Sequence, residues 1–206
     1  MRTQSKETQT SLTPDLALQI LKDGNARFVN NLKSNRNLLQ QVNDTSNGQF
    51  PFATILSCID SRTSAELIFD QGLGDVFSIR IAGNILNEDI LGSMEFGTKV
   101  VGTKILVVLG HTKCGAIVGA CNHVELGNLT TLLKKIQPAI EKETTTKTNR
   151  DGSNKEFVYN VTDLNVHLTI ERIRKESPII AELERNGQIK IVGGMYDVDN
   201  GKVVFF

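Results

Sequence analysis

The chain contains no tryptophan, only three cysteines among 206 residues, and no net formal charge, because 23 basic side chains balance 23 acidic ones. The charge balance gives no electrostatic reason to expect nucleic-acid binding. No apolar run is long enough to span a bilayer, and the polar residues 1–10 lack the apolar segment of a secretory signal. Three cysteines in a chain of this length do not indicate a disulfide scaffold. These absences predict a cytoplasmic protein with no membrane or nucleic-acid partner.

Length and composition are those of one soluble globular domain, since 39% of the residues are hydrophobic and 22% are charged. The polar residues 1–12 predict a disordered N-terminal tail, and residues 13–206 predict a single domain. Thr13-Pro14-Asp15 is a helix-start signal, with a cap, a proline in the first turn and an acidic residue. The helix is predicted to bend at Asp23-Gly24-Asn25, and a polar segment over 40–49 leads into the first strand.

Short apolar runs alternate with helical segments along the middle of the chain. Strands are predicted at 52–57, 76–81 and 104–110, and helices at 64–69 and 87–100, which is the rhythm of a parallel sheet covered on both faces. A polar surface loop is predicted over 142–155, followed by an amphipathic helix. Segments 189–192 and 202–206 flank a hairpin turn at Asp199-Asn200-Gly201. The predicted fold is α/β, with a central, mainly parallel sheet of four to five strands flanked by helices and an N-terminal helical arm.

Two short motifs follow two of the predicted strands. They are Cys58-Ile59-Asp60-Ser61-Arg62 and His111-Thr112-Lys113-Cys114-Gly115. The carboxyl ends of parallel strands meet at one edge of a sheet, so Cys58, His111 and Cys114 are expected to converge there. Two thiolates and one imidazole suit a catalytic zinc ion with one open position. Asp60 can reach the metal or its water, and Arg62 can hold Asp60 by paired hydrogen bonds.

Other interpretations of these residues carry less weight. A lone cysteine on an apolar strand is usually a core residue, but here three ligands and an Asp–Arg pair coincide. An activated thiol formed by His111 and Cys114 would leave Cys58 unexplained. A structural zinc normally has four Cys or His ligands, and no fourth one has suitable spacing. A phosphatase-type loop would have its arginine six positions after the cysteine, whereas Arg62 is four positions after Cys58.

With these motifs the chain resembles the β-class carbonic anhydrases, in the plant-like subgroup and of the bacterial type. The similarity extends over nearly the whole chain, through residues 21–29, the Arg80-Ile81-Ala82-Gly83-Asn84 loop and residues 165–178. The resemblance implies one zinc ion per chain on Cys58, His111 and Cys114, with Asp60 and Arg62 as the catalytic pair. It implies reversible hydration of carbon dioxide to bicarbonate and a proton by attack of zinc-bound hydroxide.

The resemblance also assigns the pocket and the assembly. Gln49 matches a glutamine that hydrogen-bonds substrate, and Phe77, Ala82 and Gly115 match positions that line a narrow pocket. A homodimer or tetramer is implied, in which Gln49 and Phe77 serve a neighbouring chain's zinc or their own. One subgroup of the family has a non-catalytic bicarbonate pocket that uses a tryptophan where this chain has Ile55, so no bicarbonate switch of that type is expected.

Two other functions stay open at this point. A zinc lyase or hydrolase acting on carbon disulfide or carbonyl sulfide would share every ligand. A non-catalytic zinc-binding module is disfavoured, because such a module has no need of the Asp60–Arg62 pair. His123 and His167 are more typical of solvent-facing or core residues than of proton relays.

Overall fold

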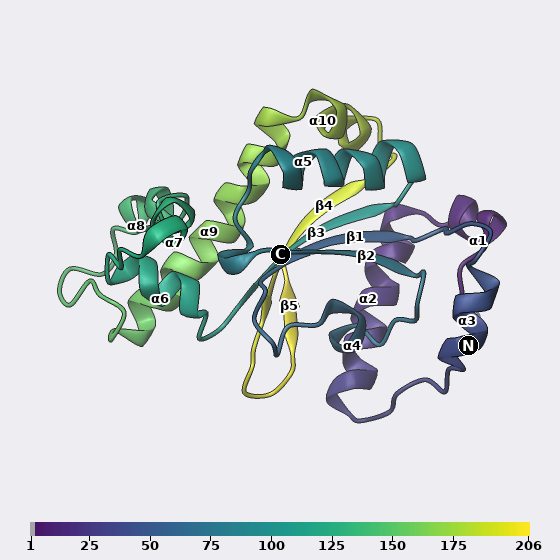
Figure 1. Ribbon diagram of the computed structural model, residues 1–206, viewed down its shortest axis with the longest axis horizontal. Coiled ribbons are helices and arrows are strands. Elements are labelled where there is room, and N and C mark those ends of the chain that lie inside the picture. Colours follow the sequence, from purple (N-terminus) through teal and green to yellow (C-terminus); the bar gives the residue numbers. More distant parts are fainter. Residues whose placement is uncertain (1–2) are drawn as a thin grey trace.

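The computed structural model describes residues 3–206, which form five strands in the order β2-β1-β3-β4-β5, with helices on both faces (Figure 1). The first four strands in this order are parallel, and β5 is antiparallel to β4. Their bounds are β1 Ala53–Ser57, β2 Val76–Arg80, β3 Ile105–His111, β4 Lys190–Tyr196 and β5 Val203–Phe205. The α/β prediction with a mainly parallel sheet of four to five strands is confirmed.

The inner strands read as continuous apolar runs because both of their faces are covered. Every residue of β1 and β3 is buried, whereas β2 lies at an edge and is half-buried. Helices α2 (Pro14–Val29) and α4 (Ala65–Ile68) pack on one face. Helices α5 (Glu88–Glu95), α9 (Lys155–Glu176) and α10 (Pro178–Arg185) pack on the other (Figure 1). This two-sided burial fixes where the strands end, and so where the predicted ligands lie.

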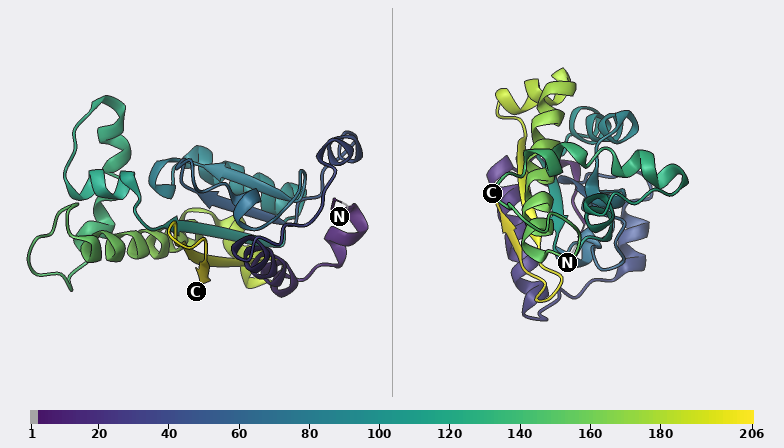
Figure 2. Two further views of the ribbon diagram at one scale, coloured as in Figure 1. Left: turned by 90° about the horizontal axis from the view of Figure 1, so that it is seen from below. Right: turned by 90° about the vertical axis from the view of Figure 1, so that its left-hand side faces the viewer.

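A third apolar cluster lies beyond the carboxyl edge of the sheet. It is built from α6 (Gly115–Cys121), α7 (Gly127–Leu133), α8 (Gln137–Lys142) and the first half of α9. These helices project from one end of the molecule (Figure 2). The loop between α8 and α9 is fixed by the buried Glu143 carboxylate, which accepts hydrogen bonds from Thr145, Thr146 and Arg150. The predicted surface loop therefore has a shape that is fixed by hydrogen bonds among its own residues.

The N-terminal segment differs from the predicted disordered tail over 1–12. Residues 1 and 2 lie outside the described residues, and α1 (Lys6–Ser11) follows them. Ser5 and Thr8 form a capping box, and the buried Gln9 amide donates to Pro51 O (2.7 Å) and Val101 O (3.2 Å). The composition indicated disorder because few residues are apolar, but the buried Gln9 side chain anchors this helix to two main-chain carbonyls of the body.

Three local predictions also differ from the structure. Helix α2 runs straight through Gly24, where a Cβ would lie 1.8 Å from Phe69 O, so this glycine permits close packing instead of a bend. The polar segment 40–49 begins inside α3 (Leu38–Asp44), capped by Asn37. The predicted helix 87–100 is α-helical only as far as Glu95, the last residue of α5, and continues as the π-helical segment η2 (Phe96–Val101). Each difference reflects packing or capping contacts that a local pattern does not contain.

Across residues 3–206, no helix combines the length and the apolar character needed to cross a membrane.

The buried Asp70 carboxylate ties the end of α4 to the N-terminal arm. It accepts hydrogen bonds from Arg27 Nε (2.5 Å), Arg36 Nη1 (2.5 Å) and Ser34 N. Burial raises the pKa of Asp70, but the bonds from the arginines and Ser34 outweigh this and lower the pKa to about 2. Because the folded pKa lies below the ordinary 3.8, the carboxylate stabilises the fold above about pH 4. This contribution is lost as the pH falls towards 2.

Asp70→Asn is accordingly expected to lower the free energy of unfolding at pH 7 by about 3 kcal/mol, since it leaves a buried arginine without its counter-charge. Urea denaturation of the variant measures this loss. The control is Asp23→Asn on the exposed face of α2, with a change within about 0.5 kcal/mol. An equally small change for Asp70→Asn would refute the role of this carboxylate.

Candidate metal centre

The three predicted ligands come from the ends of two neighbouring parallel strands. Cys58 directly follows β1, and His111 is the last residue of β3, which pairs with β1. The chain then turns sharply through Lys113, whose φ is +57°, and Cys114 becomes the N-cap of α6. The strand–turn–helix sequence thus returns the second thiol to the edge from which His111 projects.

All three ligand atoms lie within 4.8 Å of one another, and all three residues are buried. The Sγ atoms of Cys58 and Cys114 are 3.9 Å apart. The Nδ1 atom of His111 lies 2.9 Å from Thr112 O, a bond that fixes the ring, and the buried Nε2 has no hydrogen-bond partner among residues 3–206. A buried imidazole nitrogen without a partner, beside two thiols, fits a thiophilic cation with these three ligands.

The two thiols share their proton asymmetrically. The hydrogen bond from Cys114 lowers the pKa of Cys58 to about 4, although burial opposes the shift. The pKa of Cys114 is raised, because it donates to the Cys58 thiolate and is itself buried. A dication between the two sulfurs would favour loss of the proton from both thiols.

Asp60 and Arg62 form a bidentate pair beside these ligands. Arg62 Nε donates to Asp60 Oδ1 (2.9 Å), Nη2 donates to Oδ2 (2.8 Å), and the Arg62 backbone N donates to Oδ1 (3.0 Å). These hydrogen bonds hold the pKa of Asp60 well below its usual range, although partial burial opposes them. A carboxylate fixed in this way stays ionised and can accept a hydrogen bond from a group near the metal.

The pocket residues expected from the resemblance fall into two groups. Ala82 begins the short helix η1 (Ala82–Asn84), and Gly115 begins α6, so both lie next to the ligands. Gln49 is exposed and precedes β1, whereas Cys58 follows it. Phe77 is the second residue of edge strand β2 and contacts Phe96, with 6.2 Å between the ring centroids. Within one chain, therefore, Gln49 and Phe77 are not brought to the metal ligands.

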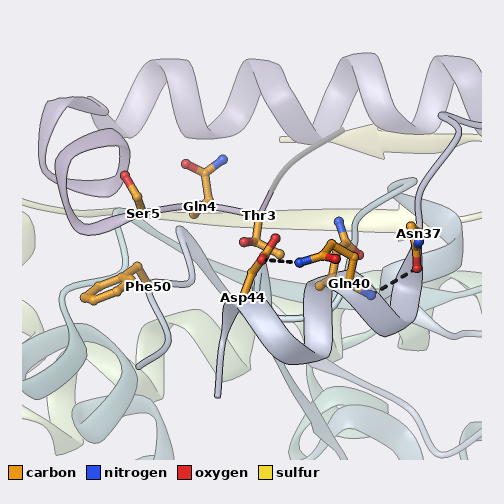
Figure 3. A pocket seen from close by; sticks show the side chains of 8 residues that line it. Thr3, Gln4, Ser5, Asn37, Gln40, Asp44 and Phe50 are labelled. Carbon is orange, nitrogen blue, oxygen red and sulfur yellow. Dashed lines mark hydrogen bonds between the residues drawn. The ribbon is translucent and has the colours of Figure 1, made fainter. Parts of the chain in front are cut away.

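Figure 1 makes the separation of Gln49 visible: α3, just before Gln49, and α6, just after Cys114, lie at opposite ends of the sheet. A strand of five residues spans about 16 Å. The α3 end also carries a pocket of about 590 Å³, lined by polar residues of the N-terminal arm and α3 and by Phe50 (Figure 3). None of the three ligands lines that pocket.

Three residues around Cys58 were not predicted to take part in the site. Arg80, at the end of β2, donates to Cys58 O (3.0 Å) and Asp60 O (2.6 Å). Thr63 Oγ1 donates to the same two carbonyls, at 3.0 and 2.9 Å. Gly83 N donates to Cys58 Sγ at 3.3 Å. No sequence pattern pointed to Thr63, and Gly83 stood out only within the loop that carried the family resemblance. Arg80 belonged to that loop and also matched a member of the subgroup's non-catalytic bicarbonate pocket.

The chain is similar to proteins of known family over most of its length. The family model described as "Carbonic anhydrase" matches residues 53–203. The chain is 35% identical over 199 residues to carbonic anhydrase 2 of Mycobacterium tuberculosis, covering 93% of this chain and 92% of that protein. It is 32% identical over 197 residues to a carbonic anhydrase of Mycolicibacterium smegmatis, covering 92% of each.

Solved structures share the fold. The β-carbonic anhydrase CafA of Aspergillus fumigatus superimposes with a TM-score of 0.72 at 24% identity, covering 93% of this chain and 89% of that one. One of two tetrameric β-carbonic anhydrases from Sordaria macrospora gives a TM-score of 0.70 at 23% identity, over 81% and 89% of the two chains.

Proposed function

The chain belongs to the β-class carbonic anhydrases, and on that premise we propose that it hydrates carbon dioxide with one zinc ion held by Cys58, His111 and Cys114. Three buried ligand atoms lie within 4.8 Å of one another, and one of them is an imidazole nitrogen that has no hydrogen-bond partner among residues 3–206. This arrangement is the main support for a bound metal ion. Zinc is favoured because thiolate and imidazole are its preferred ligands.

Cys58, His111 and Cys114 would hold a zinc ion, which would supply a Lewis acid able to lower the pKa of a bound water to about 7. The protein supplies the remaining functions. The ionised Asp60 would accept a hydrogen bond from the attacking oxygen. This bond would orient a lone pair of that oxygen toward the substrate carbon. Arg62 holds both carboxylate oxygens, which keeps Asp60 from reorienting.

We propose that Gln49 and Phe77 complete the pocket of a neighbouring chain in a homodimer or tetramer. Gln49 precedes β1 and Phe77 lies near the start of β2, whereas the ligands lie at the carboxyl ends of β1 and β3, which favours a role at a neighbouring chain's site. The half-buried edge strand β2 and the exposed Phe96 beside Phe77 are surfaces that a second copy can cover. The Sordaria macrospora relatives are described as tetrameric.

We also propose a cytoplasmic location. The Sγ atoms of Cys58 and Cys114 lie 3.9 Å apart and both cysteines are free. A reducing compartment keeps such a pair available as metal ligands, whereas an oxidising one favours a disulfide.

Inhibition of hydration by bicarbonate is predicted to be non-cooperative. Ile55 is fully buried in the core and, unlike a tryptophan at this position, offers no side-chain donor to a second bicarbonate ion. Initial rates measured against bicarbonate should give a Hill coefficient of about 1. A clearly sigmoidal curve would contradict this view of Ile55.

The proposed function is tested by stopped-flow hydration on the metal-free protein titrated with zinc. Activity should rise linearly and reach its plateau at one equivalent per chain. Assays of the same samples with carbonyl sulfide show whether the chain acts on that alternative substrate instead of carbon dioxide. A metal-free protein that is folded and fully active would overturn the proposal.

A further inference from the structure

We infer that Asn165 on α9 is a positioning residue of the metal centre, because it holds the η1 loop so that Gly83 N–H reaches the Cys58 sulfur. This inference rests on the proposed zinc site. It assigns a task to a buried side chain that lies more than one hundred positions from Cys58 in the sequence, on an element that provides no metal ligand.

The contacts form a continuous chain. The buried Asn165 carboxamide, on the part of α9 that faces the body, donates from Nδ2 to Gly83 O at 2.9 Å. Gly83 N donates to Cys58 Sγ at 3.3 Å. The carbonyl and the N–H of one residue are joined by two torsions only, so fixing the carbonyl restricts where the N–H points.

The position of Gly83 is demanding, which is why it needs an anchor. Its φ is +66°, and a Cβ there would lie 2.9 Å from Ile136 Cδ1 and 3.3 Å from Ala116 Cβ. Only glycine adopts this conformation without strain in so little space. Glycine is also the most flexible residue, so the conformation has to be fixed from outside. Helix α9 offers a rigid support, with 22 residues and an Asn154 cap.

The consequence for a metal ion is electronic and geometric. A backbone N–H donated to a thiolate withdraws charge from sulfur and fixes its lone pairs. Partners of this kind typically change metal affinity by 10- to 100-fold when they are removed. Asn165 therefore acts through Gly83 on the Cys58 ligand and does not touch the substrate.

The test compares Asn165→Leu with Thr162→Val, both in the full-length protein. Leucine keeps the branched shape and the number of heavy side-chain atoms of asparagine, although it is larger, and it cannot donate to Gly83 O. Thr162 is also buried on α9, and among residues 3–206 its hydroxyl donates to Val158 O alone (2.7 Å). Its valine variant therefore removes one buried hydrogen bond from the same helix and none that involves the η1 loop. Asn165→Ala serves as a second variant should leucine prevent folding.

Two readouts are needed, and neither depends on turnover. Chelator competition measures the zinc dissociation constant, which should rise about tenfold or more in Asn165→Leu and stay unchanged in Thr162→Val. In cobalt-substituted protein, the thiolate-to-cobalt charge-transfer band should shift for the Asn165 variant alone. Equal loss of thermal stability in both variants, with wild-type zinc affinity and an unshifted band, would overturn the inference. Wild-type protein that binds no zinc would instead refute the proposed function.

Discussion

Asp60→Asn is expected to keep one zinc ion per chain and to lose carbon dioxide hydration by roughly 10²- to 10⁴-fold. The amide has the size of the carboxylate, so the loop after β1 retains its shape. It carries no charge, however, and its NH₂ group cannot accept the second hydrogen bond that Arg62 now donates. The hydrogen-bond acceptor proposed to orient the attacking oxygen is thereby lost. Stopped-flow hydration and metal analysis of the same preparation measure both effects.

The matched control is Asp199→Asn. Asp199 lies in the turn between β4 and β5 and pairs with Lys113, which stands between two proposed ligands. Removing this exposed carboxylate changes the local charge equally but touches no proposed catalytic group. Its turnover should stay close to that of the wild type. Near-normal turnover of Asp60→Asn would remove Asp60 from the mechanism.

Cys58→Ser is expected to reduce zinc content at least about tenfold and to abolish hydration along with it. A serine hydroxyl does not ionise near neutral pH, so the centre would lose one of its two anionic ligands. The remaining His111 and Cys114 cannot hold a zinc ion tightly by themselves. Elemental analysis after exhaustive dialysis against a weak chelator measures the loss.

Cys121→Ser separates this effect from the simple loss of a buried thiol. Cys121 is buried at the end of α6, and burial raises its pKa to about 11, so it stays a neutral thiol. It lies outside the proposed ligand set. The variant should retain one equivalent of zinc, with at most a modest loss of stability. Stoichiometric zinc in Cys58→Ser would refute the ligand set.

The fold class and the family followed from the sequence because the decisive features are local and repeated. The apolar runs of β1 and β3 are buried on both faces, so their composition alone marks them as inner parallel strands. Motifs placed directly after such strands must meet at one edge. The comparisons confirm the α/β fold and the β-carbonic anhydrase family.

Contacts between distant segments could not be predicted in this way. The polar helix α1 is held by Gln9 on two main-chain carbonyls, which no composition rule anticipates. Gly24 resembled a turn signal, but the structure shows that a side chain at this position would collide with the carbonyl oxygen of Phe69. Asn165 belongs to the same class, because its partner Gly83 is 82 positions away. The role proposed for Gln49 and Phe77 involves a second chain, about which a single sequence carries no geometric information.

Two sulfurs and one imidazole nitrogen are proposed to bind a single zinc ion and to leave one position for solvent. Zinc K-edge X-ray absorption of the purified protein tests this proposal most directly. The account predicts two sulfur neighbours at about 2.3 Å and two lighter neighbours at about 2.0–2.1 Å. One lighter neighbour should vary with added anions, as an exchangeable solvent ligand does. A first shell with fewer than two sulfurs, or one that no small anion perturbs, would contradict the account.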